Sequence, residues 1–192
     1  MFALCTGALA NAKLTAVFKD FNQPIYFFGD SYMSLGDSAR WPYYAIQNGW
    51  DKFLASGFPG ANGWPHGIPS FRNIMARAKP RYVVWCLGMN GGVSDSNKAV
   101  DEVIETCDAL GVEVILSTTP CVPDSTKNNE AKNTYVKSTG KRYIDFAKAV
   151  GAETNGSSWY TGMLSNDNLH PSALGAKALY AQVLKDFPEI MR

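Results

Sequence analysis

Short apolar runs alternate with longer amphipathic stretches along most of this chain. Four runs have the length of a β-strand and cover residues 24–28, 52–55, 81–87 and 112–116. The third run is almost unbroken in hydrophobicity, as expected for a strand that helices cover on both faces. The pattern therefore predicts the strands of a parallel sheet lying between two layers of helices.

Apolar residues recur at helical spacing between and after these runs. They predict helices over residues 71–78, 100–110, 135–150 and from Pro171 to about residue 183. Gly111 is expected to end the second helix, and Pro171 suits the first turn of the last one. Strands and helices in alternation are typical of an α/β domain with a parallel sheet.

The composition agrees with one such domain over residues 24–192. Of the 192 residues, 46% are hydrophobic and 18% are charged, which suffices for a core and excludes a disordered chain. Residues 1–23 fit the alternation least well, and we interpret them as an added strand or as an arm.

Charge and hydropathy exclude several classes of partner. The net charge is +1 without a run of Lys or Arg, so neither nucleic acid nor an anionic membrane is favoured. No apolar stretch approaches the roughly 20 residues of a membrane span, and residues 1–5 lack the basic start of a signal peptide. A cytoplasmic protein and part of a longer secreted one both stay open, as does the oligomeric state.

The four cysteines are Cys5, Cys86, Cys107 and Cys121, and no two of them form a C-x-x-C pair. Their spacing gives little support to a zinc or thioredoxin-type site, so we interpret them as small buried hydrophobes. One disulfide stays open. We expect neither a metal nor a cofactor.

The residues for chemistry are sought just after the strands, because ligands bind beyond the carboxyl ends of the strands in open parallel sheets. The loops in question begin at Gly29, Ser56, Gly88 and Ser117. The first loop places Ser31 directly past a strand, where both its hydroxyl and its amide can face a cleft. A serine nucleophile needs a base within hydrogen-bond reach, although Ser31 alone would also suit a helix N-cap.

The sequence offers two histidines, His66 and His170, as that base. Asp167 precedes His170 by three residues, so its carboxylate can fold back to accept a bond from Nδ1–H and leave Nε2 free to take a proton. The alternative is a turn aspartate beside a surface histidine. His66 is interpreted as an exposed loop residue with at most a substrate contact.

The loops after the second and third strands can supply hydrogen-bond donors to a developing oxyanion. Asn90 lies between Gly88 and two further glycines, and its side-chain amide can donate, although it also suits a plain turn. The glycine-rich segment 56–63 can add a backbone N–H. Loss of one such donor costs about 2.7–4 kcal/mol of transition-state stabilisation.

At these positions the sequence resembles the SGNH (GDSL-type) hydrolase family. The motifs come in the family's order: Gly-Asp-Ser at 29–31, a glycine after the second strand, Gly-x-Asn at 88–90 and Asp-x-x-His at 167–170. The resemblance implies a flavodoxin-like, three-layer α/β/α sandwich with a parallel sheet of about five strands. No Gly-x-Ser-x-Gly elbow is present, which counts against an ordinary α/β-hydrolase.

The resemblance also implies the site residues. Ser31 would be the nucleophile, His170 the base and Asp167 its orienting acid. The oxyanion hole would comprise the N–H of Ser31, the N–H of Gly57 and the side chain of Asn90. Because Ala55 stands where the family often has an asparagine, Gly60 is the alternative to Gly57.

The expected activity is hydrolysis of short-chain acyl esters, with an O-acetyl group on a carbohydrate as the first candidate. A lysophospholipase, thioesterase or arylesterase, an acyltransferase and a non-catalytic glycan-binding module are the alternatives. The candidates for substrate contact are Asp30, Tyr32, Trp64 and Trp159, with aromatic residues able to stack on a sugar ring or wall an acyl pocket. Trp85, within a predicted strand, is expected in the core.

Overall fold

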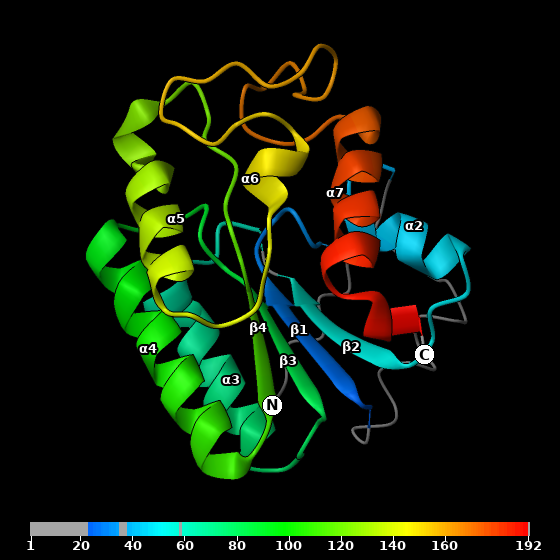
Figure 1. The fold of residues 1–192 in the computed structure, drawn as a ribbon, viewed down its shortest axis with the longest axis vertical. Coiled ribbons are helices and arrows are strands. Elements are labelled where there is room, and N and C mark those ends of the chain that lie inside the picture. The colour runs from blue at the N-terminus through cyan, green and yellow to red at the C-terminus, as the bar shows by residue number, and fades with distance from the viewer. Residues whose placement is uncertain (1–22, 35–37, 58, 192) are drawn as a thin grey trace.

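A parallel sheet forms the centre of the molecule (Figure 1). The structure is a computed structural model that describes residues 23–34, 38–57 and 59–191. Within these residues the sheet has five strands in the order β2-β1-β3-β4-β5. The strands are β1 (Ile25–Gly29), β2 (Phe53–Gly57), β3 (Tyr82–Cys86), β4 (Glu113–Ser117) and β5 (Tyr143–Ile144). This flavodoxin-like order confirms the predicted fold class, and the first four strands lie where the apolar runs predict them.

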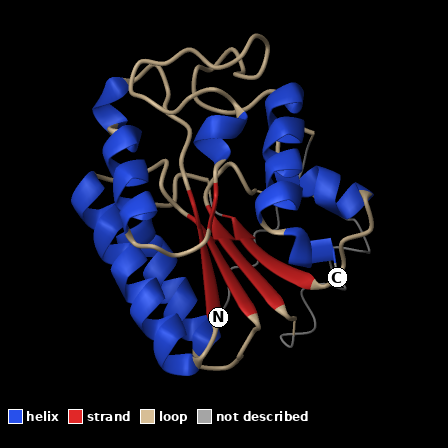
Figure 2. Ribbon diagram, in the orientation of Figure 1, coloured by secondary structure: helices blue, strands red, loops and turns tan. Residues whose placement is uncertain are grey.

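Helices cover the sheet on both faces, which gives three layers (Figure 2). The helices are α2 (Trp41–Gln47), α3 (Ile68–Met75), α4 (Val93–Leu110), α5 (Asn129–Ser138), α6 (Phe146–Ala149) and α7 (Ala173–Asp186). The core on one face joins Phe27 and Val84 to side chains of α2, α6 and α7. The core on the other face joins Phe28 and Trp85 to side chains of α3, α4 and α5. Neighbouring residues of one strand thus face opposite layers, as the two-residue repeat of a strand requires.

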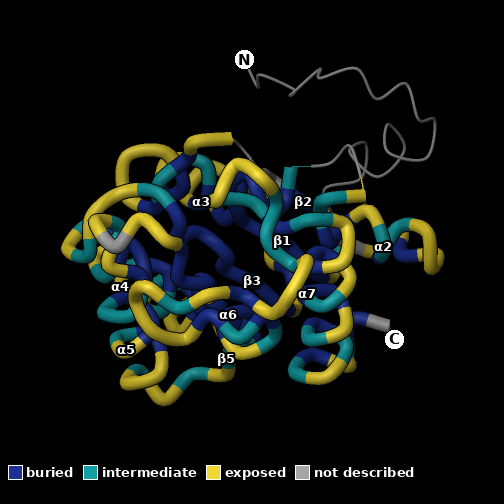
Figure 3. Tube along the Cα trace, turned by 90° about the horizontal axis from the view of Figure 1, so that it is seen from above, coloured by how far each residue is buried: buried dark blue, intermediate teal, exposed yellow. Residues whose placement is uncertain are grey.

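The neighbouring strands β1 and β3 are buried along their whole length (Figure 3). All five residues of β1 and of β3 are buried, and Trp85 lies in the core as predicted. Both strands then lead into short loops at the end of the sheet where α7 begins, which is the upper end in Figure 1. The sheet therefore holds the starts of these loops rigidly.

The predicted helix over residues 135–150 is wrong. α5 ends at Ser138, Gly140 turns the chain with a φ of 70°, and α6 begins only at Phe146. Between them Tyr143 pairs with Leu116 of β4 and forms the short edge strand β5. Two residues are too few to show a strand repeat, so the apolar pattern alone predicts one helix over this stretch.

Other elements differ from the prediction, and α3 begins at Ile68 and ends at Met75 in place of residues 71–78. α4 begins seven residues before the predicted start, at Val93, because its first turns are polar and carry no apolar stripe. α2 is not predicted at all. The last helix begins at Ala173, after Pro171, because the side chain of Ser172 caps it by accepting a bond from the amide of Gly175 at 3.2 Å.

The cysteines that the structure describes are buried and free: Cys86, Cys107 and Cys121. This confirms their interpretation as small hydrophobes, while Cys5 and the predicted arm or strand before residue 23 lie outside the described residues. Among the helices of the described ranges, none is long and apolar enough to cross a bilayer.

Candidate active site

Ser31 lies in a tight turn two residues beyond the end of β1. The amide of Met33 donates to the carbonyl of Asp30 at 3.0 Å, and the hydroxyl of Ser34 donates to the carbonyl of Ser31 at 3.0 Å. Met33 is fully buried under this turn, and a Cβ on Gly29 would lie 2.3 Å from its sulfur. Only glycine therefore allows the turn to pack this closely, and the turn holds Ser31 in one place.

His170 is the last residue of a second turn, which is held together by the carboxylate of Asp167. One oxygen of Asp167 accepts bonds from the hydroxyl of Ser165 at 2.6 Å and from the amides of Leu169 and His170 at 2.9 Å each. The amide of Ser165 donates to the carbonyl of His170, and Asn168 adopts a left-handed φ of 57°. Asn is among the residues that tolerate this conformation, so the turn is built from suitable residues.

The two turns meet in a continuous chain of hydrogen bonds. Nδ1 of His170 lies 2.7 Å from the second carboxylate oxygen of Asp167, and Nε2 lies 2.8 Å from the hydroxyl of Ser31. Because an ionised carboxylate can only accept, Nδ1 must carry a proton and Nε2 is free to accept one from the serine. The structure thus brings together the three residues predicted from the sequence motifs, although Ser31 and His170 are 139 residues apart in the chain.

The hydrogen bonds keep Asp167 ionised. Desolvation works to raise the pKa of Asp167, but the bonds from Ser165, His170 and Leu169 outweigh it and hold the pKa well below its usual value. A charged partner stabilises the imidazolium form of His170 when it takes up a proton.

The loops after β2 and β3 are joined to each other. The side-chain amide of Asn90 donates to the carbonyl of Ala61 at 3.0 Å, and Asn62 and Asn90 form a parallel β-bridge. Gly91 has a φ of 80°, and a Cβ there would lie 2.8 Å from that of Asn62. Asn90, the predicted oxyanion donor, therefore lies on a loop that is held in place by contacts with the loop after β2.

The two candidate glycines lie in different surroundings. Gly57 is the last residue of β2 and is paired with Gly29 in the sheet. Gly60 lies in the following turn with a φ of 75°, one residue before the carbonyl that Asn90 contacts. Both remain candidates, with Gly60 the nearer of the two in sequence to the Asn90 contact.

The comparisons with known proteins identify the fold. No protein-family model and no curated protein matches the sequence. Among solved structures, TesA is 19% identical and superposes with a TM-score of 0.64 over 88% of this chain and 99% of that one. A lipolytic protein of the G-D-S-L family from Desulfitobacterium hafniense is 18% identical, with a TM-score of 0.68 over 86% and 100% of the two chains. The fold is that of the G-D-S-L hydrolases.

A third solved structure of the same fold comes from Geobacillus. It is a mutant of an acetyl-xylooligosaccharide esterase, 14% identical, with a TM-score of 0.62 over 86% of this chain and 95% of that one. The letters of the G-D-S-L name read Gly-Asp-Ser-Tyr at residues 29–32 here, so a tyrosine stands where the name has leucine. The strand order of this fold explains why the predicted loops meet, because β1 and β3 are neighbours at the point where the order reverses.

Two candidates for substrate contact lie inside the G-D-S-L fold. Asp30 is 2% exposed, and its two carboxylate oxygens accept bonds from the amides of Tyr32 at 3.0 Å and Met89 at 3.2 Å. Burial raises its pKa, although these amides work against the rise. Trp159 is also buried, and its indole N–H donates to the carbonyl of Cys121 at 2.7 Å. Both side chains face the protein, where they connect loops of the site.

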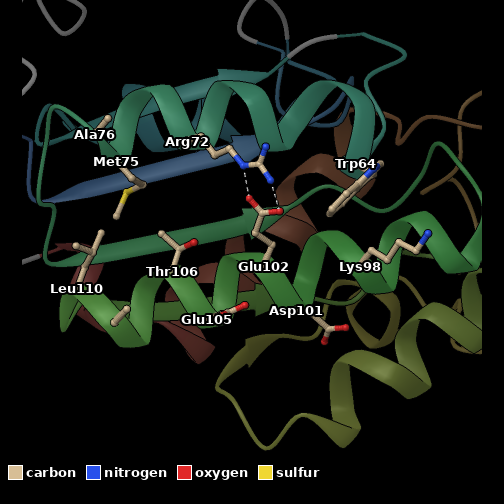
Figure 4. A pocket seen from close by; sticks show the side chains of 11 residues that line it. Trp64, Arg72, Met75, Ala76, Lys98, Asp101, Glu102, Glu105, Thr106 and Leu110 are labelled. Atoms are coloured by element: carbon tan, nitrogen blue, oxygen red, sulfur yellow. Dashed lines mark hydrogen bonds and ion pairs between the residues drawn. The ribbon is translucent and has the colours of Figure 1, made fainter.

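The other two candidates differ in exposure. Tyr32 is buried, and its ring packs beside that of His170 with the two centroids 5.9 Å apart. Trp64 is 37% exposed and lines a groove between α3 and α4, beside the ion pair of Arg72 and Glu102 (Figure 4). None of the three residues of the hydrogen-bonded chain lines this groove. His66 is exposed as predicted, and its Nδ1 accepts a bond from the amide of Asn62 at 3.3 Å.

One residue beneath the site is not among those that the sequence pattern predicts. Lys132 of α5 is buried, and its ammonium group donates to the carbonyl of Gly88 at 2.8 Å. Its spacing of four from the buried Val136 was the signal, because residues four apart share a helix face. No group of three residues suited to holding a metal occurs within the described part of the chain.

Proposed function

We propose that this protein is a serine hydrolase that cleaves carboxylic esters by acyl transfer. The observation that carries the proposal is the chain of bonds from Asp167 through His170 to Ser31, with links of 2.7 and 2.8 Å. A serine hydroxyl is a weak nucleophile until a base accepts its proton, and the base acts best when an acid fixes its tautomer. A purely structural role would not require a carboxylate, an imidazole and a hydroxyl to be hydrogen-bonded in this order.

The geometry supports two successive acyl transfers. Oγ of Ser31 attacks the ester carbonyl while Nε2 of His170 takes its proton. The tetrahedral intermediate collapses to an acyl-serine, and His170 returns the proton to the leaving alcohol. Water then attacks the acyl-serine with His170 again as base, which releases the acid and restores Ser31.

The oxyanion of each tetrahedral intermediate needs donors that are already in place. We assign this role to the N–H of Ser31, to the side-chain amide of Asn90 and to the N–H of Gly57 or Gly60. The bond from Asn90 to the carbonyl of Ala61 uses one of its two N–H groups and leaves the other to donate. Donors that are braced before the reaction cost little reorganisation when charge develops.

For the substrate we propose a short acyl group, with an O-acetyl ester of a carbohydrate as the first candidate. The acetyl-xylooligosaccharide esterase among the structures of the same fold supports this choice. A lysophospholipase or thioesterase activity is the second candidate, since the fold also includes proteins described as lipases and as lipolytic. Acyl transfer to a sugar hydroxyl would use the same residues.

The test is turnover of p-nitrophenyl acetate, butyrate and octanoate by the wild type, by Ser31→Ala and by Ser94→Ala. Ser94 is an exposed serine of α4 and serves as the matched control. We expect activity that is highest on acetate, unchanged in Ser94→Ala and lost in Ser31→Ala. A preference for octanoate would contradict the short acyl group. Equal rates for the wild type and Ser31→Ala on every ester would refute the hydrolase.

Hydrolysis and transfer are separated by their products. Acetylated xylooligosaccharide is incubated with the wild type and with an excess of unmodified oligosaccharide. We expect free acetate to account for all the acetyl groups lost. New acetylated oligosaccharide in place of acetate would show a transferase.

A further inference from the structure

A lysine is buried beneath the loop that carries Asn90. The side chain of Lys132 is 2% exposed, and lysine is almost never this buried unless its charge has partners. Its ammonium group donates to the carbonyl of Gly88 at 2.8 Å and to the side-chain oxygen of Asn129 at 3.1 Å. The first of these partners lies two residues before Asn90.

An acidic side chain holds the other end of the same peptide group. The carbonyl of Gly88 and the amide of Met89 belong to one planar peptide unit. The amide of Met89 donates to a carboxylate oxygen of Asp30 at 3.2 Å, while Lys132 donates to the carbonyl. An ammonium group and a carboxylate thus fix the orientation of the peptide from which the chain continues into Asn90.

The surroundings leave this peptide little room to turn. A Cβ on Gly88 would lie 2.1 Å from the hydroxyl oxygen of Thr119. The amide and the carbonyl of Thr119 are both bonded to the side chain of Asn133, at 2.7 and 2.8 Å. One face of α5 therefore presents polar side chains to the loops after β3 and β4. The buried polar side chains of this helix are those of Asn129, Lys132 and Asn133, and of these three Lys132 alone carries a positive charge.

We propose that Lys132 is a positioning residue for the oxyanion hole: with Asp30 it clamps the Gly88–Met89 peptide so that the side chain of Asn90 meets the developing negative charge. This inference rests on the proposed hydrolase function. Lys132 does not touch the substrate and acts only through the peptide that it holds.

Protonation of Lys132 gives the clamp a pH dependence. Burial, followed by repulsion from Lys127, lowers the pKa of Lys132 to about 8, while Asp30 works in the opposite direction. Cys121, a further titratable group that acts on Lys132, stays neutral at this pH, since burial raises its pKa to about 11. The charge is present below pH 8 and lost above it, so turnover should fall as the pH rises through this value.

The first test compares Lys132→Met with Lys148→Met, an exposed lysine of α6. On p-nitrophenyl acetate we expect kcat of Lys132→Met to fall about tenfold, less than for loss of an oxyanion donor itself, with KM within twofold. The decline of wild-type kcat near pH 8 should be absent from Lys132→Met and retained in Lys148→Met. Lys127→Met should move the decline to higher pH, because it removes the repulsion.

A second readout does not depend on activity. In the nuclear magnetic resonance spectrum of the wild type, the backbone amide of Met89 and the side-chain amide of Asn90 should both titrate near pH 8. The same signals should not titrate in Lys132→Gln, a neutral variant that retains a donor. This readout holds even if Lys132→Met fails to fold.

The outcomes separate the two proposals. A folded Lys132→Met with wild-type kcat and an unchanged pH profile would overturn the positioning role, as would Met89 and Asn90 signals that ignore the titration near pH 8. A wild type without activity on any ester would refute the hydrolase instead. In that case the titration of the two amide signals still decides whether the clamp exists.

Discussion

The phenol of Tyr32 donates a 2.5 Å hydrogen bond to the main-chain carbonyl of Leu169. Tyr32 follows Ser31 in the chain and Leu169 precedes His170, so one bond connects the turn of the nucleophile to the turn of the base. Burial raises the pKa of Tyr32 well above its usual value, and the phenol therefore remains a donor throughout the working pH range. A leucine at this position could not form the bond.

Tyr32→Phe should lower kcat on p-nitrophenyl acetate about fivefold, because it removes a bond worth about 1 kcal/mol and leaves the Leu169 carbonyl without this donor. KM should stay within twofold, since the ring remains. Tyr160→Phe, at a residue that is 59% exposed, is the matched control and should behave as the wild type. Equal kcat values for the two variants would show that the bond does not align His170.

Asp167→Asn should reduce kcat by about 10³–10⁴-fold without unfolding the protein, because an amide in place of the carboxylate no longer secures the tautomer of His170. Asp51→Asn, at an exposed aspartate, is the control. Far-ultraviolet circular dichroism of both variants checks the fold. A loss of less than tenfold would contradict the assigned role of Asp167.

The same carboxylate predicts an effect of acid on stability. The pKa of Asp167 is lower in the folded protein than in the unfolded chain, so its contribution is present above the unfolded pKa and lost as the pH falls through the folded one. Urea unfolding from pH 6 down to pH 3 should show a smaller loss of stability for Asp167→Asn than for the wild type. Parallel curves for the two proteins would contradict this prediction.

Much of the fold could be predicted because its strongest signals are local. The apolar runs at β1 and β3 report burial on both faces, and the residues after them fall at strand ends whatever the strand order. The local pattern could not predict contacts between segments that are far apart in the sequence. β5 exists only because Tyr143 pairs with β4, and a pair of residues carries no repeat of its own.

The polar first turns of helices could not be predicted from the apolar pattern either. The predicted helices began at their first apolar stripe, which left out the first turns of α4 and the part of α5 that carries Lys132. The polar side chains in that part of α5 are buried, and they bond to the loops after β3 and β4. Trp159 is likewise buried, although the residues around it in the sequence are mostly polar.

Gly88→Ala should destabilise the protein by about 1–3 kcal/mol, as overpacking usually does, because its Cβ would lie 2.1 Å from the hydroxyl oxygen of Thr119. The double variant Gly88→Ala with Thr119→Ala should recover part of that loss, since the next side-chain atom of Thr119 is 3.4 Å away. A double-mutant cycle of urea unfolding measures the coupling. Additive effects would show that the two side chains do not collide.

Trp64→Ala should leave kcat/KM unchanged on both p-nitrophenyl acetate and acetylated xylooligosaccharide. Trp64 lies in the groove of α3 and α4 (Figure 4), whose lining includes neither Ser31 nor His170. We therefore expect a sugar chain whose acetyl group reaches Ser31 to make no direct contact with Trp64. Tyr43→Ala, at a comparably exposed aromatic residue of α2, controls for loss of surface area. A drop in kcat/KM confined to the oligosaccharide and to Trp64→Ala would overturn this expectation, because the sugar would then have to extend from Ser31 into the groove.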